Sequence, residues 1–270
     1  MAKFVEFTKM AGAGNDFIII DNRAKEISEN PARIAKRLCE RKFSIGADGL
    51  LLLEKSKKAD VRMRIFNPDG SEAEMCGNGV RCLAEFAFEK KITKSRFSVE
   101  TPAGRIGAEV CGNIVKAKLI DPTDLKLNFE VDVNGKKELL NFINTGVPHV
   151  VKVVDRVEHF DLSSLAPAVR YHAYFAPRGT NVNFISIKSD KSIDVRTYER
   201  GVEGETLACG TGSAASALVA ASLKSLKSPV LVHTRGGEAL KVYFLKNGSQ
   251  FKEVYLEGEV VTTFEGRVKL

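Results

Sequence analysis

Two glycine-rich segments, Cys76-Gly77-Asn78-Gly79 and Cys209-Gly210-Thr211-Gly212, each stand at the start of an apolar stretch. The two cysteines are 133 residues apart, about half of the chain. Thr101 follows the first cysteine by 25 residues, and Thr234 follows the second by the same interval. Chance is the alternative explanation, because glycine and threonine are common, but the equal interval disfavours it. The repeat predicts two similar halves, each with strands wrapped around one central helix.

The apolar residues behind each segment recur with the period of a helix. In both stretches they occupy positions i, i+3, i+4 and i+7, which lie on one helix face. We therefore expect helices at 79–90 and 211–223. The second stretch is apolar on nearly every side, which predicts a buried helix. The residues concerned are Val80, Leu83, Ala84 and Ala87 in the first stretch, and Ala214, Ala215, Ala217, Leu218, Val219, Ala220 and Ala221 in the second.

Many short strands and few helices make up the remaining pattern. A further helix is expected at 31–42, with Asn30 as its cap and Pro31 in its first turn. Strands are expected at 3–9, 16–21, 50–54, 61–66, 95–100, 104–110, 114–120, 150–154, 181–187, 193–198, 230–234, 239–245 and 253–257.

These elements predict an α/β (α+β) fold of two pseudo-symmetric halves, each with mixed or antiparallel strands around a central helix. The first half is expected to be residues 1–118 with Cys76, completed by a last strand at about 260–270. The second is expected to be residues 119–259 with Cys209.

The composition limits the classes of function. The chain has 270 residues, of which 44% are hydrophobic and 28% charged, so disordered and fibrous classes are excluded. The net charge is +7, and the densest basic stretch, 55–58, has no interleaved aromatic residues. We interpret it as a solvated turn and expect no nucleic-acid partner. No run of about 18 apolar residues exists, so no membrane span is expected.

The cysteines indicate a reducing compartment. Residues 1–6 resemble neither a signal peptide nor a transit peptide. Five cysteines are spread along a chain that is too long for a disulfide scaffold. We therefore expect reduced thiols and a cytoplasmic protein.

Each Cys-Gly-x-Gly segment combines a sulfur with a helix N-terminus. The free backbone N–H groups there carry partial positive charge, which favours the thiolate and can also hold a carboxylate. One such segment would suggest a nucleophilic cysteine, but two in repeated halves suggest two sulfurs that face each other across a cleft. Inversion at a carbon needs that arrangement, because one thiolate removes a proton from one face and one thiol delivers a proton to the other.

Several other cysteine and glycine patterns give no evidence for a functional site. A buried cysteine is more often a small inert hydrophobe than a catalyst, and we interpret Cys39, Cys82 and Cys111 in this way. A zinc site is disfavoured, because no Cys-x-x-Cys pair exists and only four histidines are present. The segment 12–17 lacks the third glycine of a dinucleotide fingerprint and is followed by a strand.

At these residues the sequence resembles the diaminopimelate epimerase family. The similar segments are 9–17, 66–81 and 198–212, and the resemblance extends over nearly the whole chain. It implies a cofactor-independent isomerase that interconverts LL- and meso-diaminopimelate, on the route to lysine and bacterial cell-wall peptides. It also implies that Cys76 and Cys209 are the two acid–base groups, with no metal and no cofactor. The resemblance, not the composition, argues against bound pyridoxal phosphate.

The resemblance further implies a set of substrate-binding residues. Backbone N–H groups at Gly77, Asn78, Gly210 and Thr211 would hold the carboxylate at the reacting centre, and Asn15, Asn67, Asn181, Glu199 and Arg200 would bind mainly the distal end. Arg200 suits a carboxylate, and Glu199 suits an ammonium group. His149 and Glu199 would tune the cysteine pair. Without the resemblance, Asn15 and Asn181 would be interpreted as turn residues.

Two departures from the family pattern concern the substrate. Val147 stands where many members carry asparagine, and Gly49 stands where others carry glutamine. A racemase of another amino acid, such as histidine, is therefore an alternative. A cysteine hydrolase or transferase with His149 as base is a second, and a non-catalytic carboxylate-binding protein is a third. The partner expected in each case is a small molecule, and a homodimer is compatible with the sequence.

Overall fold

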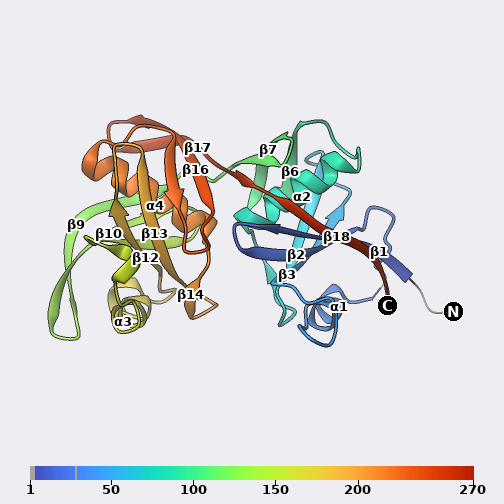
Figure 1. The fold of residues 1–270 in the computed structure, drawn as a ribbon, viewed down its shortest axis with the longest axis horizontal. Helices are drawn as coiled ribbons and strands as arrows, with labels where there is room; N and C mark the ends of the chain where they lie inside the picture. Colours follow the sequence, from blue (N-terminus) through green and yellow to red (C-terminus); the bar gives the residue numbers. More distant parts are fainter. Residues whose placement is uncertain (1–3, 28) are drawn as a thin grey trace. The chain divides into compact units, whose positions relative to one another are not determined.

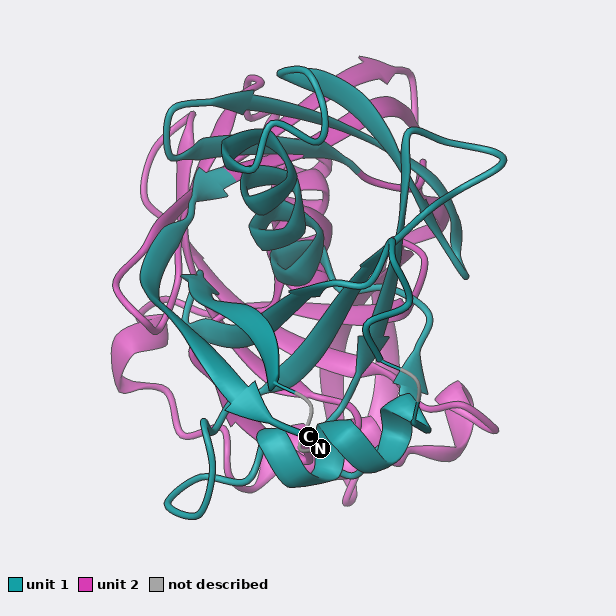
Figure 2. Ribbon diagram, turned by 90° about the vertical axis from the view of Figure 1, so that its right-hand side faces the viewer, with its two compact units in different colours: residues 1–118, 258–270 teal, residues 119–257 magenta. Residues whose placement is uncertain are grey.

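The computed structural model describes residues 4–27 and 29–270, which form two compact units. One unit contains the chain up to residue 118 together with 258–270, and the other contains 119–257 (Figure 2). The chain therefore leaves the first unit once and returns to it for its last strand. The strand expected at 3–9 is β1, Phe4–Gly12, and Lys3 lies outside the described residues.

The first unit is a sheet of strands around one helix, α2 (Figure 1). Its hydrogen-bonded strand order is β18-β1-β2-β3-β4-β6-β7-β8, in which only the β2–β3 and β4–β6 pairs are parallel. The elements are β1, β2 (Asn15–Asp21), α1 (Pro31–Leu38), β3 (Gly49–Glu54), β4 (Val61–Phe66), β5 (Glu72–Ala73), α2 (Gly77–Glu89), β6 (Arg96–Thr101), β7 (Gly104–Cys111), β8 (Ile114–Lys118) and β18 (Val261–Lys269).

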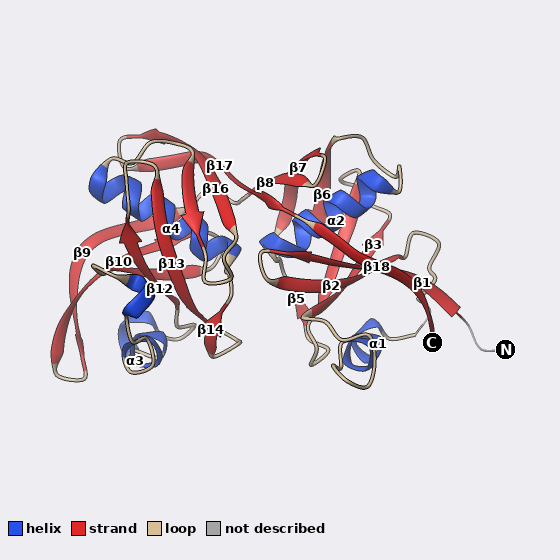
Figure 3. Cartoon of the chain, viewed as in Figure 1, coloured by secondary structure: helices blue, strands red, loops and turns tan. Residues whose placement is uncertain are grey.

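The second unit repeats this arrangement around α4 (Figure 3). Its strand order is β9-β10-β11-β12-β13-β15-β16-β17, and again only the third and fifth pairs, β11–β12 and β13–β15, are parallel. The elements are β9 (Thr123–Val133), β10 (Lys136–Asn144), β11 (Pro148–Val153), η1 (Val157–His159), α3 (Leu165–Arg170), η2 (Ala173–Phe175), β12 (Asn181–Ile187), β13 (Ser192–Glu199), β14 (Gly204–Thr206), α4 (Gly210–Lys224), β15 (Val230–His233), β16 (Ala239–Asn247) and β17 (Gln250–Glu259).

The matching pair order confirms the expected fold of pseudo-symmetric, strand-rich halves. Every apolar residue named for the two central helices is buried in its unit. Around α2 these side chains join a core from the surrounding strands that includes Met10, Leu51 and Val99. Each helix therefore has strand side chains on most of its surface, and Figure 2 shows the strands of the first unit enclosing α2. No helix in the described part of the chain is long and apolar enough to span a bilayer.

Three expectations from the sequence differ from the structure. Helix α1 ends at Leu38 and not at residue 42, because Lys42 has φ 75° and the N–H of Gly46 bonds to the Leu38 carbonyl at 2.9 Å. The hairpin of β9 and β10 was not predicted, although two local signals indicate it. Apolar residues alternate with polar ones along β9, at Leu125, Leu127, Phe129, Val131 and Val133. The turn, Asn134-Gly135, has φ values of 55° and 80°, as a two-residue hairpin turn requires.

Cys111 is the third difference. It is exposed at the end of β7, whereas Cys39 and Cys82 are buried as expected. The alternation of the strand directs its side chain outward, so the interpretation as a buried hydrophobe is wrong for Cys111.

Candidate active site

The sulfur of Cys76 caps the N-terminus of α2. Cys76 is the N-cap residue, with extended backbone angles φ −141° and ψ 119°, and its Sγ accepts a hydrogen bond from the Gly79 N–H at 3.4 Å. This is the position at which serine or aspartate usually caps a helix. The side chain is partly exposed, so the sulfur is held at the positive helix end and remains accessible.

Cys209 occupies the same position on α4. Its φ and ψ are −120° and 115°, and its Sγ accepts from the Gly212 N–H at 3.4 Å. Thr211 Oγ1 lies 3.6 Å from the same sulfur. Both cysteines therefore sit in equivalent caps, where helix-end charge stabilises a thiolate and nearby backbone N–H groups can bind an anion.

A chain of side-chain hydrogen bonds orients the start of α2. Arg81 Nη2 donates to Asn78 Oδ1 at 2.9 Å, Asn78 Nδ2 donates to Asn15 Oδ1 at 2.7 Å, and Asn15 Nδ2 donates to Asp48 Oδ2 at 3.1 Å. A guanidinium at one end and a carboxylate at the other fix the direction of both amides. The structure thus brings Asn15 and Asn78 together, on β2 and α2.

Asp16, which follows Asn15, anchors the same turn. Burial by itself would raise the pKa of its carboxyl, but hydrogen bonds from Arg41 and Lys9 lower that pKa to about 2. Lys9 Nζ lies 2.7 Å from Asp16 Oδ2, and Arg41 also bonds to Asp48 at 2.9 Å. This ion-pair cluster holds the β1–β2 turn against the loop that precedes β3.

Asn67 lies apart from this chain, in the turn between β4 and β5. Its backbone N–H donates to the Ser71 carbonyl at 2.9 Å, and its Nδ2 donates to Ser71 Oγ at 2.9 Å. The described contacts of Asn67 are therefore those of a turn residue on the segment that leads to Cys76.

Asn181 and Arg200 are connected in the second unit. Asn181 is buried at the start of β12 and pairs in register with His149 of β11. Its Nδ2 donates to the Pro148 carbonyl at 3.1 Å, and its Oδ1 accepts from the Arg200 N–H at 2.8 Å. Asn181 therefore ties the end of β13 to the start of β11.

The side chains of Glu199 and Arg200 are partly exposed at the end of β13. Glu199 Oε2 accepts from Thr206 Oγ1 at 3.0 Å, and Arg200 Nη1 donates to the Arg178 carbonyl at 3.2 Å. An accessible carboxylate next to an accessible guanidinium can recognise the ammonium and carboxylate of an amino acid.

His149 is fully buried and uncharged. Burial away from water, and to a smaller extent the positive charge of Arg200, lowers the pKa of His149 to about 3. Its Nδ1 lies 3.2 Å from Asn183 Nδ2, and Thr197 Oγ1 donates to Asn183 Oδ1 at 2.9 Å. The sequence analysis missed Asn183 and Thr197, although polar residues at inward positions of an apolar strand are a recognisable signal.

The surroundings of Gly49 explain its small size, whereas nothing in the structure explains valine at position 147. A Cβ at position 49 would lie 3.2 Å from the Phe66 carbonyl oxygen and 3.3 Å from the ring of Phe17, so a larger side chain requires a shift of that ring. Val147 accepts a hydrogen bond from the Thr145 N–H at 3.1 Å through its carbonyl, which any residue could do.

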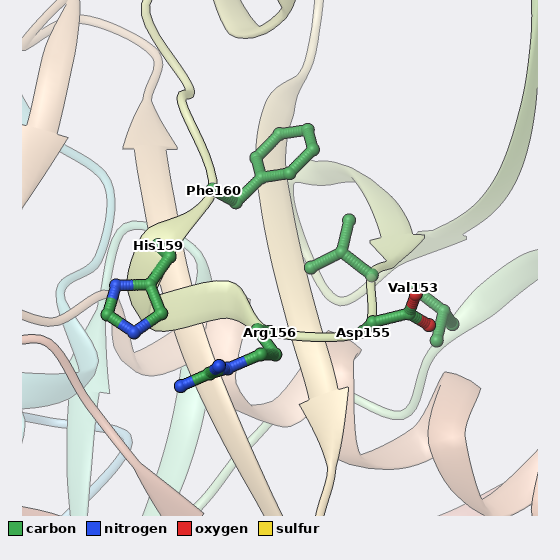
Figure 4. Close-up of a pocket in the computed structure, with 6 residues that line it drawn as sticks. Val153, Asp155, Arg156, His159 and Phe160 are labelled. Atoms are coloured by element: carbon green, nitrogen blue, oxygen red, sulfur yellow. The ribbon is translucent and has the colours of Figure 1, made fainter.

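A surface hollow of about 410 Å³ lies elsewhere, at the end of β11. It is lined by Val153, Val154, Asp155, Arg156, His159 and Phe160 (Figure 4) and contains none of the predicted site residues. Among residues 4–27 and 29–270, no group of three or more histidine, cysteine or acidic side chains could hold a metal ion.

Comparison with known proteins identifies the family. The model of the family described as diaminopimelate epimerase matches residues 7–119 and 141–263. The chain belongs to the diaminopimelate epimerase family. The diaminopimelate epimerase of Aquifex aeolicus is 44% identical over 276 residues, 98% of each chain. That of Archaeoglobus fulgidus is 43% identical over 281 residues, 98% of this chain and 97% of the relative.

Solved structures outside this family share the fold. A phenazine biosynthesis protein of the PhzF family from Bacillus anthracis superposes with a TM-score of 0.78 at 18% identity, covering 99% of this chain and 100% of that one. A probable proline racemase from Agrobacterium radiobacter superposes with a TM-score of 0.71 at 15% identity, covering 98% and 93%. At these identities the likeness concerns the fold.

Proposed function

We propose that this chain is a cofactor-independent epimerase that interconverts LL- and meso-diaminopimelate, an isomerase step in the formation of lysine and peptidoglycan precursors. The observation that carries the proposal is the pair of helix-capping sulfurs, Cys76 and Cys209, each bonded to the third backbone N–H of its helix at 3.4 Å. Membership of the diaminopimelate epimerase family supports the substrate.

In the proposed reaction the two sulfurs exchange roles. One thiolate removes the alpha proton from one face of the substrate, and the other thiol delivers a proton to the opposite face. The proton lost and the proton gained balance, so no oxidant or co-reactant is required. The pair must hold one proton between them, because a step in either direction needs one acid and one base.

The helix ends would stabilise the carbanion. The alpha proton of an amino acid is a very weak acid, so charge that develops toward the carboxylate must be neutralised. Backbone N–H groups at Gly77, Asn78, Gly210 and Thr211 are fixed donors for that carboxylate. At the distal end, Glu199 and Arg200 would bind ammonium and carboxylate, with Asn15, Asn67 and Asn181 shaping the pocket, and this binding would orient the reacting carbon.

A cysteine hydrolase with His149 as base is less well supported. A base that works near neutral pH needs a pKa near that pH. Burial lowers the pKa of His149 to about 3, which makes it a poor proton acceptor, and its Nδ1 already faces an amide donor. We instead propose that His149 and Glu199 tune the cysteine pair.

The test is alanine substitution of each proposed catalytic cysteine. Cys76→Ala and Cys209→Ala should each abolish epimerisation of diaminopimelate, and Cys→Ser variants should be poor because a hydroxyl is much less acidic. Cys111→Ala is the matched control, since Cys111 is exposed and caps no helix. Full activity of either catalytic variant would refute the two-sulfur mechanism.

Substrate identity requires a separate measurement. With no added cofactor, solvent deuterium should appear at the alpha carbon of diaminopimelate. Chiral analysis of the same reaction should show the LL and meso forms interconverting. A panel with histidine, proline and glutamate tests the racemase alternative, which the fold neighbours and the residues at 49 and 147 keep relevant. Exchange in another amino acid, with none in diaminopimelate, would reassign the substrate.

A cytoplasmic homodimer is the expected state of the enzyme. None of the five cysteines, all of which lie in the described residues, forms a disulfide, which suits a reducing compartment. The exposed apolar side chains of Val261 and Phe264 on β18 offer a surface for a second copy. Light scattering that gave a monomer mass at micromolar concentration would contradict the dimer.

A further inference from the structure

Three polar side chains lie beneath the first turn of α4, on adjacent strands. His149, Asn183 and Thr197 come from β11, β12 and β13, and all three are buried. A Cβ added at Gly212 would clash with Asn183 Oδ1 and lie 3.3 Å from Cys209 Sγ. The amide of Asn183 and the sulfur of Cys209 therefore border the same small space.

The equivalent positions of the first unit are apolar. Leu51 and Ile65 form the cross-strand pair of β3 and β4, as Asn183 and Thr197 do on β12 and β13. A Cβ added at Gly79 would meet Leu51 Cδ2 at 3.4 Å and Ile65 Cδ1 at 3.6 Å. The fold therefore does not require a polar layer at this place, and burying an amide and a hydroxyl is costly unless their hydrogen bonds are made.

The hydrogen bonds of Asn183 fix its orientation. Its Nδ2 lies 2.8 Å from the Val150 carbonyl oxygen, which can only accept, so this atom must be the amide nitrogen. Its Oδ1 accepts from Thr197 Oγ1 at 2.9 Å. If the amide turned over, its oxygen would face the Val150 carbonyl oxygen and that hydrogen bond would be lost, so the Val150 carbonyl fixes the orientation.

This orientation decides which nitrogen of His149 carries the proton. Asn183 Nδ2 donates toward His149 Nδ1 at 3.2 Å, so Nδ1 is the acceptor and the proton of the neutral ring is on Nε2. His149 Nε2 is buried and has no hydrogen-bond partner within the described ranges. A buried donor without a partner is costly, which indicates a role.

We propose that Asn183 is a positioning residue of the epimerase: with Thr197 it holds His149 as the Nε2–H tautomer and fixes the first turn of α4 at Cys209. The inference rests on the proposed function for its effect on catalysis, whereas the tautomer itself is a property of the resting protein. The polar layer makes the two helix caps chemically different, although their geometry is the same.

The tautomer is measured by nitrogen-15 NMR of the histidine ring, with the other three histidines as internal references. The wild type should show His149 protonated at Nε2. Asn183→Asp should move the proton to Nδ1, because a carboxylate accepts where the amide donated. A wild-type His149 protonated at Nδ1 would overturn the proposal.

Kinetics of a matched pair test the positioning role. Thr197→Val removes the hydroxyl and keeps the shape, so kcat should fall about tenfold with little change in KM, because even a small misplacement of a positioned group slows the reaction. Thr197→Ser keeps the hydroxyl and should restore kcat. Ile65→Val, in the apolar layer of the first unit, is the control for packing loss alone and should keep kcat.

The two proposals fail in different ways. Equal kcat values for Thr197→Val and Thr197→Ser, or an unchanged tautomer and kcat in Asn183→Asp, would overturn the positioning role. A wild type with the Nε2–H tautomer but no alpha-proton exchange in diaminopimelate would refute the proposed function and support the tautomer assignment.

Discussion

Alanine substitution of one glycine in each helix cap tests the difference between the two units. Gly79 and Gly212 are the third helical residues of α2 and α4, and both have helical backbone angles that alanine adopts without strain. Alanine is favoured over glycine inside a helix by about 1 kcal/mol, and by less in the first turn. Helix propensity alone therefore predicts that both variants are slightly more stable than the wild type.

The atoms around the added methyl group reverse this stability prediction at position 212. At position 79 the methyl group would lie 3.4 Å from Leu51 Cδ2 and 3.6 Å from Ile65 Cδ1, which are ordinary contacts. At position 212 it would clash with Asn183 Oδ1, whose amide is fixed by the Val150 carbonyl and the Thr197 hydroxyl. Displacing the amide costs about two buried hydrogen bonds, each worth about 1 kcal/mol, together with the strain of overpacking.

We therefore expect Gly212→Ala to lower the free energy of unfolding by about 2 kcal/mol and Gly79→Ala to change it by less than about 1 kcal/mol, in the stabilising direction. Chemical denaturation gives both free energies, and the first variant should melt about 5 °C lower. Its epimerase activity should also fall, because Cys209 shares the displaced space. Equal stability of the two variants would refute the reasoning.

Three further predictions concern buried charge. Burial, and to a smaller extent the nearby charge of Glu89, raises the pKa of Glu85 to about 7, so the stability that the protonated carboxyl provides is lost as the pH rises from 4.5 through 7. Glu85→Gln should therefore become about 1–3 kcal/mol more stable relative to the wild type between pH 5 and pH 8, as denaturation at both pH values would show. The same stability difference between variant and wild type at both pH values would contradict this prediction. The pKa of His149 is lowered from 6.5 to about 3, so the stability that the neutral ring provides is fully present above pH 6.5 and is lost as the pH falls toward 3. The wild type should therefore lose about 2 kcal/mol between pH 6.5 and pH 4.5, whereas His149→Gln should not, and paired urea titrations would detect the difference. Arg81→Met should lower the free energy of unfolding by about 2 kcal/mol and raise KM, because Asn78 Oδ1 would lose the buried Arg81 donor that lies 2.9 Å away. An unchanged KM in steady-state assays would show that the chain of amides does not orient the substrate site.

The central helices and the chemistry at their ends follow from local sequence. A cysteine followed by two glycines and an apolar helical period specifies a cap, a close backbone approach and a buried helix, all within about ten residues. The same holds for the strands with strong alternation. The hairpin of β9 and β10 was missed although its local signals, the alternation along β9 and the Asn134-Gly135 turn, are present in the sequence.

Residues distant in sequence decide the environment of each cap, and the sequence by itself cannot show which ones. Asn183 and Thr197 are 14 residues apart and meet only because β12 and β13 pair in that register, with His149 on the neighbouring strand. Asp48, Asn15 and Asn78 are linked for the same reason. Hydrogen bonds act over about 3 Å, so the identity of a polar partner depends on strand register and on the packing of the helix. The sequence determined the two capped helices and the reaction that they suggest. The tertiary structure alone decided that one cap lies over an apolar layer and the other over an amide, a hydroxyl and an imidazole.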